Sequence, residues 1–447
     1  MVLTTMRRSA MTRQAIDPRT SRHSMRHVAF ASMIGTALEW YDFMIYNTMA
    51  ALVFGQLFFP QTSPMVGTLM AFSTYAVGYV SRPLGGVIFG QLGDRLGRRT
   101  VLTLTLVLMG ACTGLIALLP TYRAIGLASP LVLVMLRLFQ GIALGGEWAG
   151  AVLLGVEHGQ QERRGLHASW AQMGPGAGTV ASSAVIAIVA ACVSSEQFMS
   201  WGWRLPFALS GILAGVGLWI RHGVGETPEF EKLQNSGKKV ASPVLHLFRY
   251  HAKSLLFASM SRIGPDVLYA LLVVFSLTYA TQVLGLSRSV ILSALLVGAA
   301  LSVPATAGFG VLADKVGVRA VYMAGLVASV PVICLFFPIM NTGHTAAIIL
   351  IVTGGLIVHA SMYAVQGAFI TACFPAEIRY SGSSISYTFG SLAGGGAFAP
   401  LIMTVLYRTT SSSFTIALYA IAATGVTFLG LAMAGQYFAQ EKHNNAH

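Results

Sequence analysis

Charged side chains are scarce in this sequence. Only 10% of its 447 residues are Asp, Glu, Lys or Arg, whereas 55% are hydrophobic, and the mean hydropathy is +0.69. A soluble globular domain carries about 25% charged residues. The composition therefore excludes an ordinary soluble protein, and we expect the lipid bilayer to surround most of the chain.

Negatively charged residues are rarer than positively charged ones. The chain has 15 Asp and Glu against 28 Lys and Arg, which gives a formal net charge of +13. A nucleic-acid-binding protein gathers its basic residues on one solvated face. In this chain they stand in short segments between apolar stretches. This distribution is typical of membrane topology and does not indicate a nucleic-acid partner.

Cysteine and motifs for bond chemistry are sparse as well. The four cysteines are far apart, form no C-x-x-C pair, and predict neither disulfides nor a metal site. The sequence contains no phosphate-binding loop G-x-x-x-x-G-K-[ST], no potassium selectivity filter and no nucleophile motif. We therefore expect no ATP-driven transport, no enzyme activity and no cofactor.

Long apolar stretches are abundant. A membrane-spanning helix needs about 20 such residues, so the sequence predicts an all-α integral membrane protein with twelve transmembrane helices. Their approximate limits are 28–55, 66–90, 100–119, 130–155, 166–192, 204–221, 255–281, 289–312, 320–339, 345–373, 382–407 and 413–437.

Basic residues orient these helices. If the Arg-rich N-terminal segment is a cytoplasmic tail rather than a cleaved signal peptide, the outer loops hold only Arg123, Arg204, Arg288 and Arg408. The positive-inside rule then puts both termini in the cytoplasm. We expect a cytoplasmic tail 1–27, a six-helix bundle 28–221, a cytoplasmic central loop 222–254, a second six-helix bundle 255–437 and a cytoplasmic tail 438–447.

One stretch recurs half a chain apart. Gly90–Arg99, GQLGDRLGRR, returns in altered form as Gly310–Arg319, GVLADKVGVR. Each copy stands between two long apolar stretches, so it predicts a short charged turn between two membrane-spanning helices. A weaker echo relates Glu162–Gly165, after the fourth span, to Glu377–Arg379, after the tenth. These repeats indicate a duplicated membrane protein.

Two carboxylates lie inside the first predicted helix. Glu39 and Asp42 are three residues apart on one helix face, where each charge costs at least about 2.5 kcal/mol in the hydrocarbon. Carboxylates this close repel each other when both are ionised, so one of them can exchange a proton near neutral pH. The alternative is that both pair with basic residues of another helix and only fix the packing.

The fourth predicted helix carries a polar stripe. Arg137, Gln140 and Glu147 recur on one side of it, beside two G-x-x-x-G patterns that permit close helix packing. We therefore expect this helix to line a cavity, with Glu147 as a further candidate proton carrier. The alternative is an Arg–Glu pair that only holds helices together.

Arginine residues within predicted helices are candidate ligands for an anion. Arg82, in the second helix, can bind a carboxylate through two parallel hydrogen bonds, or it can pair with Glu39 or Asp42. In the seventh helix, Arg262 and Asp266 are four residues apart and can form an internal ion pair. The other polar candidates of the second half are Tyr269, His359, Tyr363 and Gln366.

At these residues the chain resembles the major facilitator superfamily. GQLGDRLGRR is similar to the superfamily's loop between helices 2 and 3, RLFQG to its fourth-helix motif, and GVLADKVGVR to the second copy of the loop. More narrowly, the chain resembles the metabolite:proton symporter family, which includes shikimate, α-ketoglutarate, citrate and proline/betaine permeases. The strings that carry this resemblance are GTALEWYDFMIY, SRPLGGVIFG, LGGEWAGA, SWGWRLPF, ETPEF and FPAEIRYSG, and SEQFMSWGWRLPF points to the shikimate-permease side.

The resemblance implies two six-helix bundles around a central site that opens alternately to the two sides of a bacterial inner membrane. It implies proton-coupled uptake of a small organic solute, a carboxylate such as shikimate being favoured. Uptake of a zwitterionic osmolyte such as proline or betaine is one alternative. Proton-coupled efflux is another, for which Gly174–Pro175 is the local sign. We expect a monomer that is driven by the proton gradient alone, with protons, solute and lipid as its partners.

The residues and the resemblance together nominate three sets of functional positions. The proton-coupling candidates are Glu39, Asp42 and Glu147. The substrate-binding candidates are Arg82, Arg137, Gln140, Arg262, Asp266, Tyr269, Tyr363 and Gln366. The cytoplasmic gate candidates are Gly90, Asp94, Arg95, Gly97, Arg98, Arg99, Asp314, Lys315 and Arg319. Val318 interrupts the paired basic residues of the second loop, so we expect the second copy to be the weaker contact.

Overall fold

The computed structural model describes residues 18–237, 239–395 and 398–444. All regular elements in this part of the chain are helices, as the sequence predicts. Ten of them are long and apolar enough to span a membrane, and they correspond to the last ten predicted spans. The predicted tails lie partly outside the described residues, and both adjoining helices extend into them, to Pro18 and to Asn444.

The helices of the first half follow one another from Pro18 to His222. They are α1 (Pro18–Met49), η1 (Ala50–Phe54), α2 (Gly55–Phe58), α3 (Pro64–Val80), α4 (Arg82–Leu96), α5 (Arg98–Leu118), α6 (Tyr122–Ile125), α7 (Ala128–His158), η2 (Gln161–Arg163), α8 (Arg164–Gln172), α9 (Gly174–Cys192), α10 (Ser195–Gln197), η3 (Phe198–Gly202) and α11 (Arg204–His222).

Two short linker helices and the second half come next. They are α12 (Pro228–Ser236), α13 (Pro243–Tyr250), α14 (Ala252–Tyr269), η4 (Ala270–Phe275), α15 (Ser276–Thr278), η5 (Tyr279–Val283), α16 (Arg288–Val316), α17 (Val318–Asn341), α18 (Thr345–Ala372), η6 (Ala376–Ile378), α19 (Arg379–Gly394), α20 (Phe398–Thr410) and α21 (Ser413–Asn444).

The first two predicted spans are helical too, but they are less apolar or shorter than the other ten. α1 carries Glu39 and Asp42 in its apolar part, and charged groups lower the hydropathy of any segment that contains them. The second span is divided at Ser81 into α3 and α4. Pro83, in the first turn of α4, has no N–H with which to continue the hydrogen bonds of α3.

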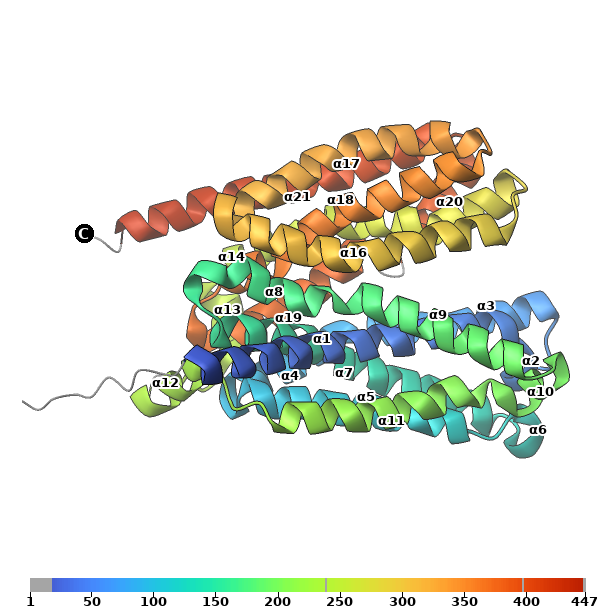
Figure 1. Cartoon of the computed structure of the whole chain (residues 1–447), viewed down its shortest axis with the longest axis horizontal. Coiled ribbons are helices and arrows are strands. Elements are labelled where there is room, and N and C mark those ends of the chain that lie inside the picture. The colour runs from blue at the N-terminus through green and yellow to red at the C-terminus, as the bar shows by residue number, and fades with distance from the viewer. Residues whose placement is uncertain (1–17, 238, 396–397, 445–447) are drawn as a thin grey trace, which may run out of the picture.

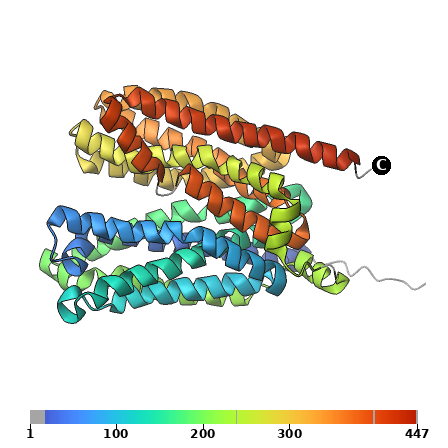
Figure 2. The same cartoon turned by 180° about the vertical axis from the view of Figure 1, so that it is seen from behind.

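The helices form two groups that lie side by side. Figure 1 shows α1 to α11, in blue to green, below α14, α16, α17, α18, α20 and α21, in yellow to red, whereas α19 overlaps the first group, and Figure 2 shows the two groups from behind. Each group has an apolar core of its own, around Phe207 in the first and Phe336 in the second. A further core contains residues of both groups, such as Val152 and Ile385.

This shared core marks one end of the molecule, on the left in Figure 1, where the linker helices and the C-terminus lie. We call it the joined end and define it by Asp94 of α4, Asp314 of α16 and the two linker helices. At the opposite end, the cores that the structure describes are each confined to one helix group.

The two copies of the repeated turn have the same backbone conformation. Gly97 separates α4 from α5 with a φ of 111°, and Gly317 separates α16 from α17 with a φ of 97°. Side chains with a Cβ rarely adopt such angles, so glycine is the residue that fits both turns. The predicted turn between two membrane helices is therefore confirmed in each half.

The fifth predicted span is interrupted within the sequence MGPGAG, residues 173–178. Met173 separates α8 from α9, and Pro175 lies in the first turn of α9. A Cβ at Gly174 would overlap Thr36 of α1, and one at Gly178 would overlap Tyr41. The glycines of this motif therefore serve close packing of α9 against α1.

Alanine at the two turn glycines is expected to have unequal effects. Gly317→Ala should cost about 1–2 kcal/mol, since only the strained backbone angle opposes it and open space surrounds its Cβ. Gly97→Ala should cost more, because its Cβ would also displace Glu226 and approach Phe230. Thermal unfolding of the two purified variants in detergent measures the difference. Equal losses of melting temperature would contradict this account of Gly97.

Candidate functional site

Asp94 joins the first helix group to the second. Its side chain accepts hydrogen bonds from the backbone N–H groups of Tyr380 (3.0 Å) and Ser381 (2.9 Å), in the first turn of α19. The carboxylate thus caps the positive end of a helix dipole that belongs to the other group. Gly90, one turn earlier in α4, permits this approach, because a Cβ there would lie 3.0 Å from the Ser381 Cα.

Asp314 makes the same contact in the opposite direction. It accepts hydrogen bonds from the backbone N–H groups of Gly165 (2.7 Å) and Leu166 (3.2 Å), at the start of α8. Gly310, one turn earlier in α16, lies against Ser169. The repeated turn therefore caps, in each half, a helix of the other half. This contact explains the weak sequence similarity between Glu162–Gly165 and Glu377–Arg379. Each of these segments contains the start of a capped helix, α8 in the first half and α19 in the second.

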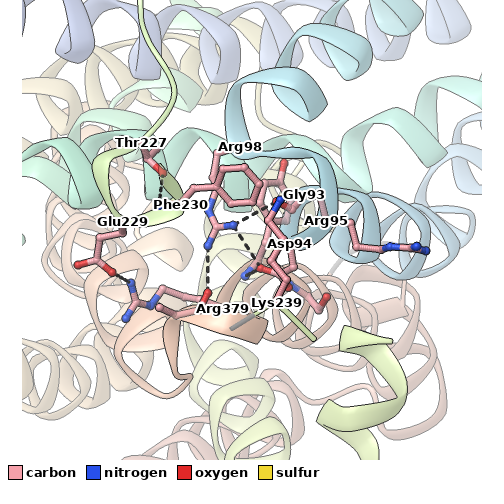
Figure 3. A network of polar contacts seen from close by, with 12 residues as sticks. Gly93, Asp94, Arg95, Arg98, Thr227, Glu229, Phe230, Lys239 and Arg379 are labelled. Carbon is pink, nitrogen blue, oxygen red and sulfur yellow. Dashed lines mark hydrogen bonds and ion pairs between the residues drawn. The ribbon is translucent and has the colours of Figure 1, made fainter. Parts of the chain in front are cut away.

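Arg98 and Arg379 surround a buried glutamate that sequence reasoning missed. Glu157, at the end of α7, accepts from Arg98 Nε (3.2 Å) and from Arg379 Nη1 (3.3 Å). Arg98 also donates to the carbonyl oxygens of Gly93 and Ala376, both at 3.1 Å. Figure 3 shows Arg98 between Phe230 and the end of α4. Residues from both helix groups thus share one network.

The ETPEF segment of the linker completes this network. Glu226 accepts from the backbone N–H of Arg98 (3.0 Å) and so caps α5. Thr227 donates to Glu157 (2.6 Å), and Glu229 accepts from Arg379 (2.6 Å). Burial alone raises the pKa of Glu229, but the hydrogen bond and charge of Arg379 outweigh it and lower the pKa below its ordinary value. The Glu229 contact is therefore present at neutral pH and is lost as the pH falls through that lowered value.

The other gate candidates contribute less to the contact between the groups. Arg95 and Lys315 have exposed side chains, and Figure 3 shows Arg95 directed away from the network. Arg99 donates to His222 O within the first group, and Arg319 donates to Ala432 O within the second. The position of Arg98 is taken in the second copy by Val318, whose side chain cannot donate a hydrogen bond.

A buried ion pair lies halfway along the first helix group. Arg82 Nη2 of α4 is 3.8 Å from Glu39 Oε1 of α1, and both side chains are almost fully buried. The Arg82 guanidinium lies over the rings of Phe43 (4.5 Å) and Tyr79 (4.2 Å). Of the two partners that the sequence allowed for Arg82, the structure selects Glu39.

Asp42 belongs to a separate hydrogen-bond network. It accepts from Ser210 of α11 and from Thr113 Oγ1 of α5 (2.6 Å). Gln140 Nε2 donates to the same Thr113 oxygen (2.6 Å), and Arg137 Nη1 donates to Gln140 Oε1 (2.8 Å). The two carboxylates of α1 thus have different partners, although they are only three residues apart.

Glu147 has a partner that the sequence did not single out. It forms a buried ion pair with Arg221, the penultimate residue of α11, and accepts from Thr105 (2.5 Å). Arg221 lies at the edge of a predicted span, where basic residues are common, so no pattern distinguished it. A Cβ at Gly35 of α1 would overlap this pair, so α1 packs directly against it.

The second helix group carries a matching ion pair. Arg262 Nε is 2.9 Å from Asp266 Oδ2, which confirms the predicted internal pair of α14. Arg262 Nη1 donates to Gln366 Oε1 of α18 (2.8 Å), and the guanidinium lies 3.6 Å from the centre of the Tyr387 ring. Gln366 Nε2 in turn donates to the Tyr322 hydroxyl (2.9 Å).

Aromatic side chains line the boundary between the two groups at this level. Tyr269 of α14 lies edge-on to Trp40 of α1 at 5.8 Å, and it contacts His359, which stacks on Tyr363 at 5.3 Å. Trp40 was not among the predicted site residues, because an aromatic residue beside a carboxylate has no periodic signal of its own.

Trp148 and Gln172 are further contacts that sequence reasoning missed. Trp148 of α7 stacks on Tyr387 of α19 at 3.8 Å. Trp148 Nε1 donates to Gln172 Oε1 (2.8 Å), and Gln172 Nε2 donates to Tyr363 O (2.9 Å). The two helix groups are therefore connected by polar and aromatic contacts in the middle of the molecule as well as at the joined end.

The Trp40–Tyr269 contact joins the two helices that carry a carboxylate of each ion pair, within one turn of Glu39 and of Asp266. The two ion pairs therefore lie near the same level of the boundary, one in each helix group. Arg137, Asp42 and Glu147 belong to networks inside the first group. Buried charges on both sides of a boundary between two helix groups are typical of a membrane transport protein.

Comparisons with known proteins agree with this class. The family model of the Major Facilitator Superfamily matches residues 32–315. The chain is 38% identical over 404 residues to the shikimate transporter of Escherichia coli (strain K12), a match that covers 89% of this chain and 91% of that protein. It is 31% identical over 389 residues to the proline/betaine transporter of the same organism, covering 83% of this chain and 76% of that protein.

A solved structure shows the same fold. The proton:xylose symporter XylE bound to 6-bromo-6-deoxy-D-glucose superposes on the chain with a TM-score of 0.73 at 15% sequence identity, over 93% of this chain and 96% of that one. The chain belongs to the major facilitator superfamily. It is a multi-pass membrane protein and a secondary transporter of small solutes, not an enzyme.

Neutralising Asp94 is expected to open the joined end. Asp94→Asn removes the charge from two buried hydrogen bonds, each worth about 1.5–3 kcal/mol when one partner is charged. Spin labels at Arg95→Cys and Lys315→Cys, in a chain whose Cys192 and Cys334 are replaced by Ser, report the separation of the helix groups by double electron–electron resonance. The distance distribution should gain a longer component.

Glu196→Gln serves as the control for this experiment. Glu196 is exposed in α10, far along the chain from either turn and at the end of the molecule opposite to the joined end. It should leave the distance distribution unchanged. An identical distribution for Asp94→Asn and the unmutated protein would rule out the proposed role of the carboxylate.

Proposed function

We propose that this protein imports a small organic acid together with protons across the bacterial inner membrane. A shikimate-like carboxylate is the favoured substrate, in agreement with the resemblance to a shikimate transporter. One observation carries the proposal: each helix group holds a buried Arg–carboxylate pair, Arg82–Glu39 in the first and Arg262–Asp266 in the second, and the Trp40–Tyr269 contact joins the helices of Glu39 and Asp266 across the boundary.

Such a pair can couple an anion to a proton. When a substrate carboxylate binds Arg82 or Arg262, it takes the place of the internal carboxylate. The displaced carboxylate, buried and without its partner, then takes up a proton, because an unpaired charge in a low-dielectric site is costly. Anion and proton enter together, and the net charge of the site does not change.

Glu39 is the favoured proton carrier among the three candidates. Its ion pair with Arg82 is long, at 3.8 Å. Asp42 is satisfied by two hydroxyl donors, and Glu147 is held by Arg221 and Thr105. We assign these two to helix packing within the first group. Asp266 is the matching carrier of the second group.

The repeated turns act as the gate in this proposal. Twelve spans with both termini in the cytoplasm put the joined end on the cytoplasmic side, as the positive-inside rule predicts. Residues 28–221 and 255–437 then move as two bodies about the central site. The Asp94 and Asp314 contacts close the cytoplasmic side, and breaking them lets the solute leave inward. We infer that the monomer performs the whole cycle.

Uptake of a zwitterion is the second candidate function. A quaternary or secondary ammonium group is held by aromatic faces, and Trp40, Tyr269, His359 and Tyr363 lie together at the boundary beside the two ion pairs. Proline/betaine transporters are among the relatives. The two candidates differ in the ligand that elicits proton entry.

The substrate class and the proton coupling can be tested in one experiment. The external pH of a lightly buffered, de-energised suspension of expressing cells is followed while shikimate, α-ketoglutarate, citrate, proline and betaine are added in turn. An organic acid should make the medium alkaline, with no change in cells that carry the empty vector. Alkalinisation by proline or betaine alone would favour the second candidate. A constant pH with every solute would contradict proton symport of this panel.

Replacing Glu39 should separate binding from proton coupling. Glu39→Gln keeps the size of the side chain but cannot release a proton, so exchange of labelled for unlabelled solute should persist while uphill accumulation is lost. With one coupled proton the loss is about tenfold for each pH unit of gradient. Glu196→Gln, at an exposed site, should accumulate solute normally. Full accumulation by Glu39→Gln would remove Glu39 from the mechanism.

A further inference from the structure

The linker helix α13 has an exposed apolar face. Leu245 and Phe248, three residues apart on one face, are 66% and 48% exposed, whereas Pro243 and Leu247, four residues apart on the opposite face, are buried, Leu247 in the shared core. Exposing an aromatic or aliphatic side chain to water costs free energy in proportion to its apolar area. This face therefore needs an apolar partner.

Basic side chains accompany this face. Arg249 of α13 and Lys253, at the start of α14, are both exposed. The sequence contains no Asp or Glu between Lys232 and Asp266, so no acidic residue of this segment neutralises them. An apolar face with basic neighbours is the pattern of a helix that lies in the headgroup region of an anionic membrane.

The position of α13 agrees with that pattern. Only one residue separates it from the membrane helix α14, whose Leu256 is also exposed. α13 contacts α4 of the first group as well as α14, α19 and η6 of the second. In Figure 1, α13 lies at the joined end near the boundary of the two groups, whereas α12 lies at the end of the first group.

We propose that α13 is an interfacial helix that binds anionic phospholipid on the membrane surface at the joined end. Leu245 and Phe248 enter the acyl boundary. Arg249 and Lys253 bind the phosphate of an anionic headgroup. The lipid is chosen over a protein partner because only one residue separates α13 from a membrane helix, and because exposed basic side chains accompany the apolar face.

Lipid binding can be measured without any transport assay, so its failure is distinguishable from failure of the proposed transport function. Native mass spectrometry of the full chain, titrated in detergent with phosphatidylglycerol or phosphatidylcholine, gives the preference for the anionic lipid. The double variant Arg249→Ala/Lys253→Ala should lower that preference at least about fivefold. The swap Arg249→Lys/Lys253→Arg keeps both charges and should retain it. An unchanged preference in the alanine variant would overturn the proposal.

A second measurement tests the apolar half of the proposal. Phe248→Cys is introduced into a chain whose Cys192 and Cys334 are replaced by Ser, and a water-soluble maleimide is applied to proteoliposomes of phosphatidylethanolamine and phosphatidylglycerol. Ser236→Cys, exposed on polar α12 at the same end, is the control for sidedness and should react fast. Labelling of Phe248→Cys should be at least about fivefold slower than labelling of this control. Equally fast labelling at both positions would show that α13 faces water, as expected for a soluble partner's docking site, and would overturn the proposal.

Discussion

A carboxylate at the end of one helix group that accepts backbone N–H groups from the other is the interaction on which this structure depends. Asp94 caps α19 and Asp314 caps α8, so the two halves hold each other by the same contact made in opposite directions. Each contact satisfies helix-terminal donors that have no partner within their own helix, and the positive end of the helix dipole stabilises the carboxylate charge. Glycine at positions 90 and 310 lets the helices come close enough.

The central site follows from this alignment. Once the joined end holds the halves in register, each half places one buried Arg–carboxylate pair near the boundary, and Trp148 stacks on Tyr387 across it. The proposed gate and the proposed site are thus parts of one boundary. A change that separates the halves at the joined end also changes the surroundings of the central charges, and the proposed coupling of solute and proton requires such a link.

Local patterns predicted much of this molecule. Apolar stretches located the helices, the repeated turn predicted the duplication, and the spacing of Arg262 and Asp266 predicted their ion pair. Patterns of this kind depend on neighbours within a turn or two of helix, so they are visible in one sequence. Glu157 and Arg221 were missed because their partners lie 59 or more residues away along the chain, and nothing near either residue distinguishes it from an ordinary helix end.

The sequence by itself determined that this chain lies in a membrane, that it is built from two related halves, and which charges lie inside the apolar stretches. Only the tertiary structure decided which charges pair between different helices. Glu39 pairs with Arg82, Asp42 accepts from hydroxyl groups, and Glu147 pairs with Arg221. The reason is that helical spacing defines the face on which a side chain lies but not the helix packed against that face. In a low-dielectric interior, the neighbour that packing supplies is the one that must satisfy the charge.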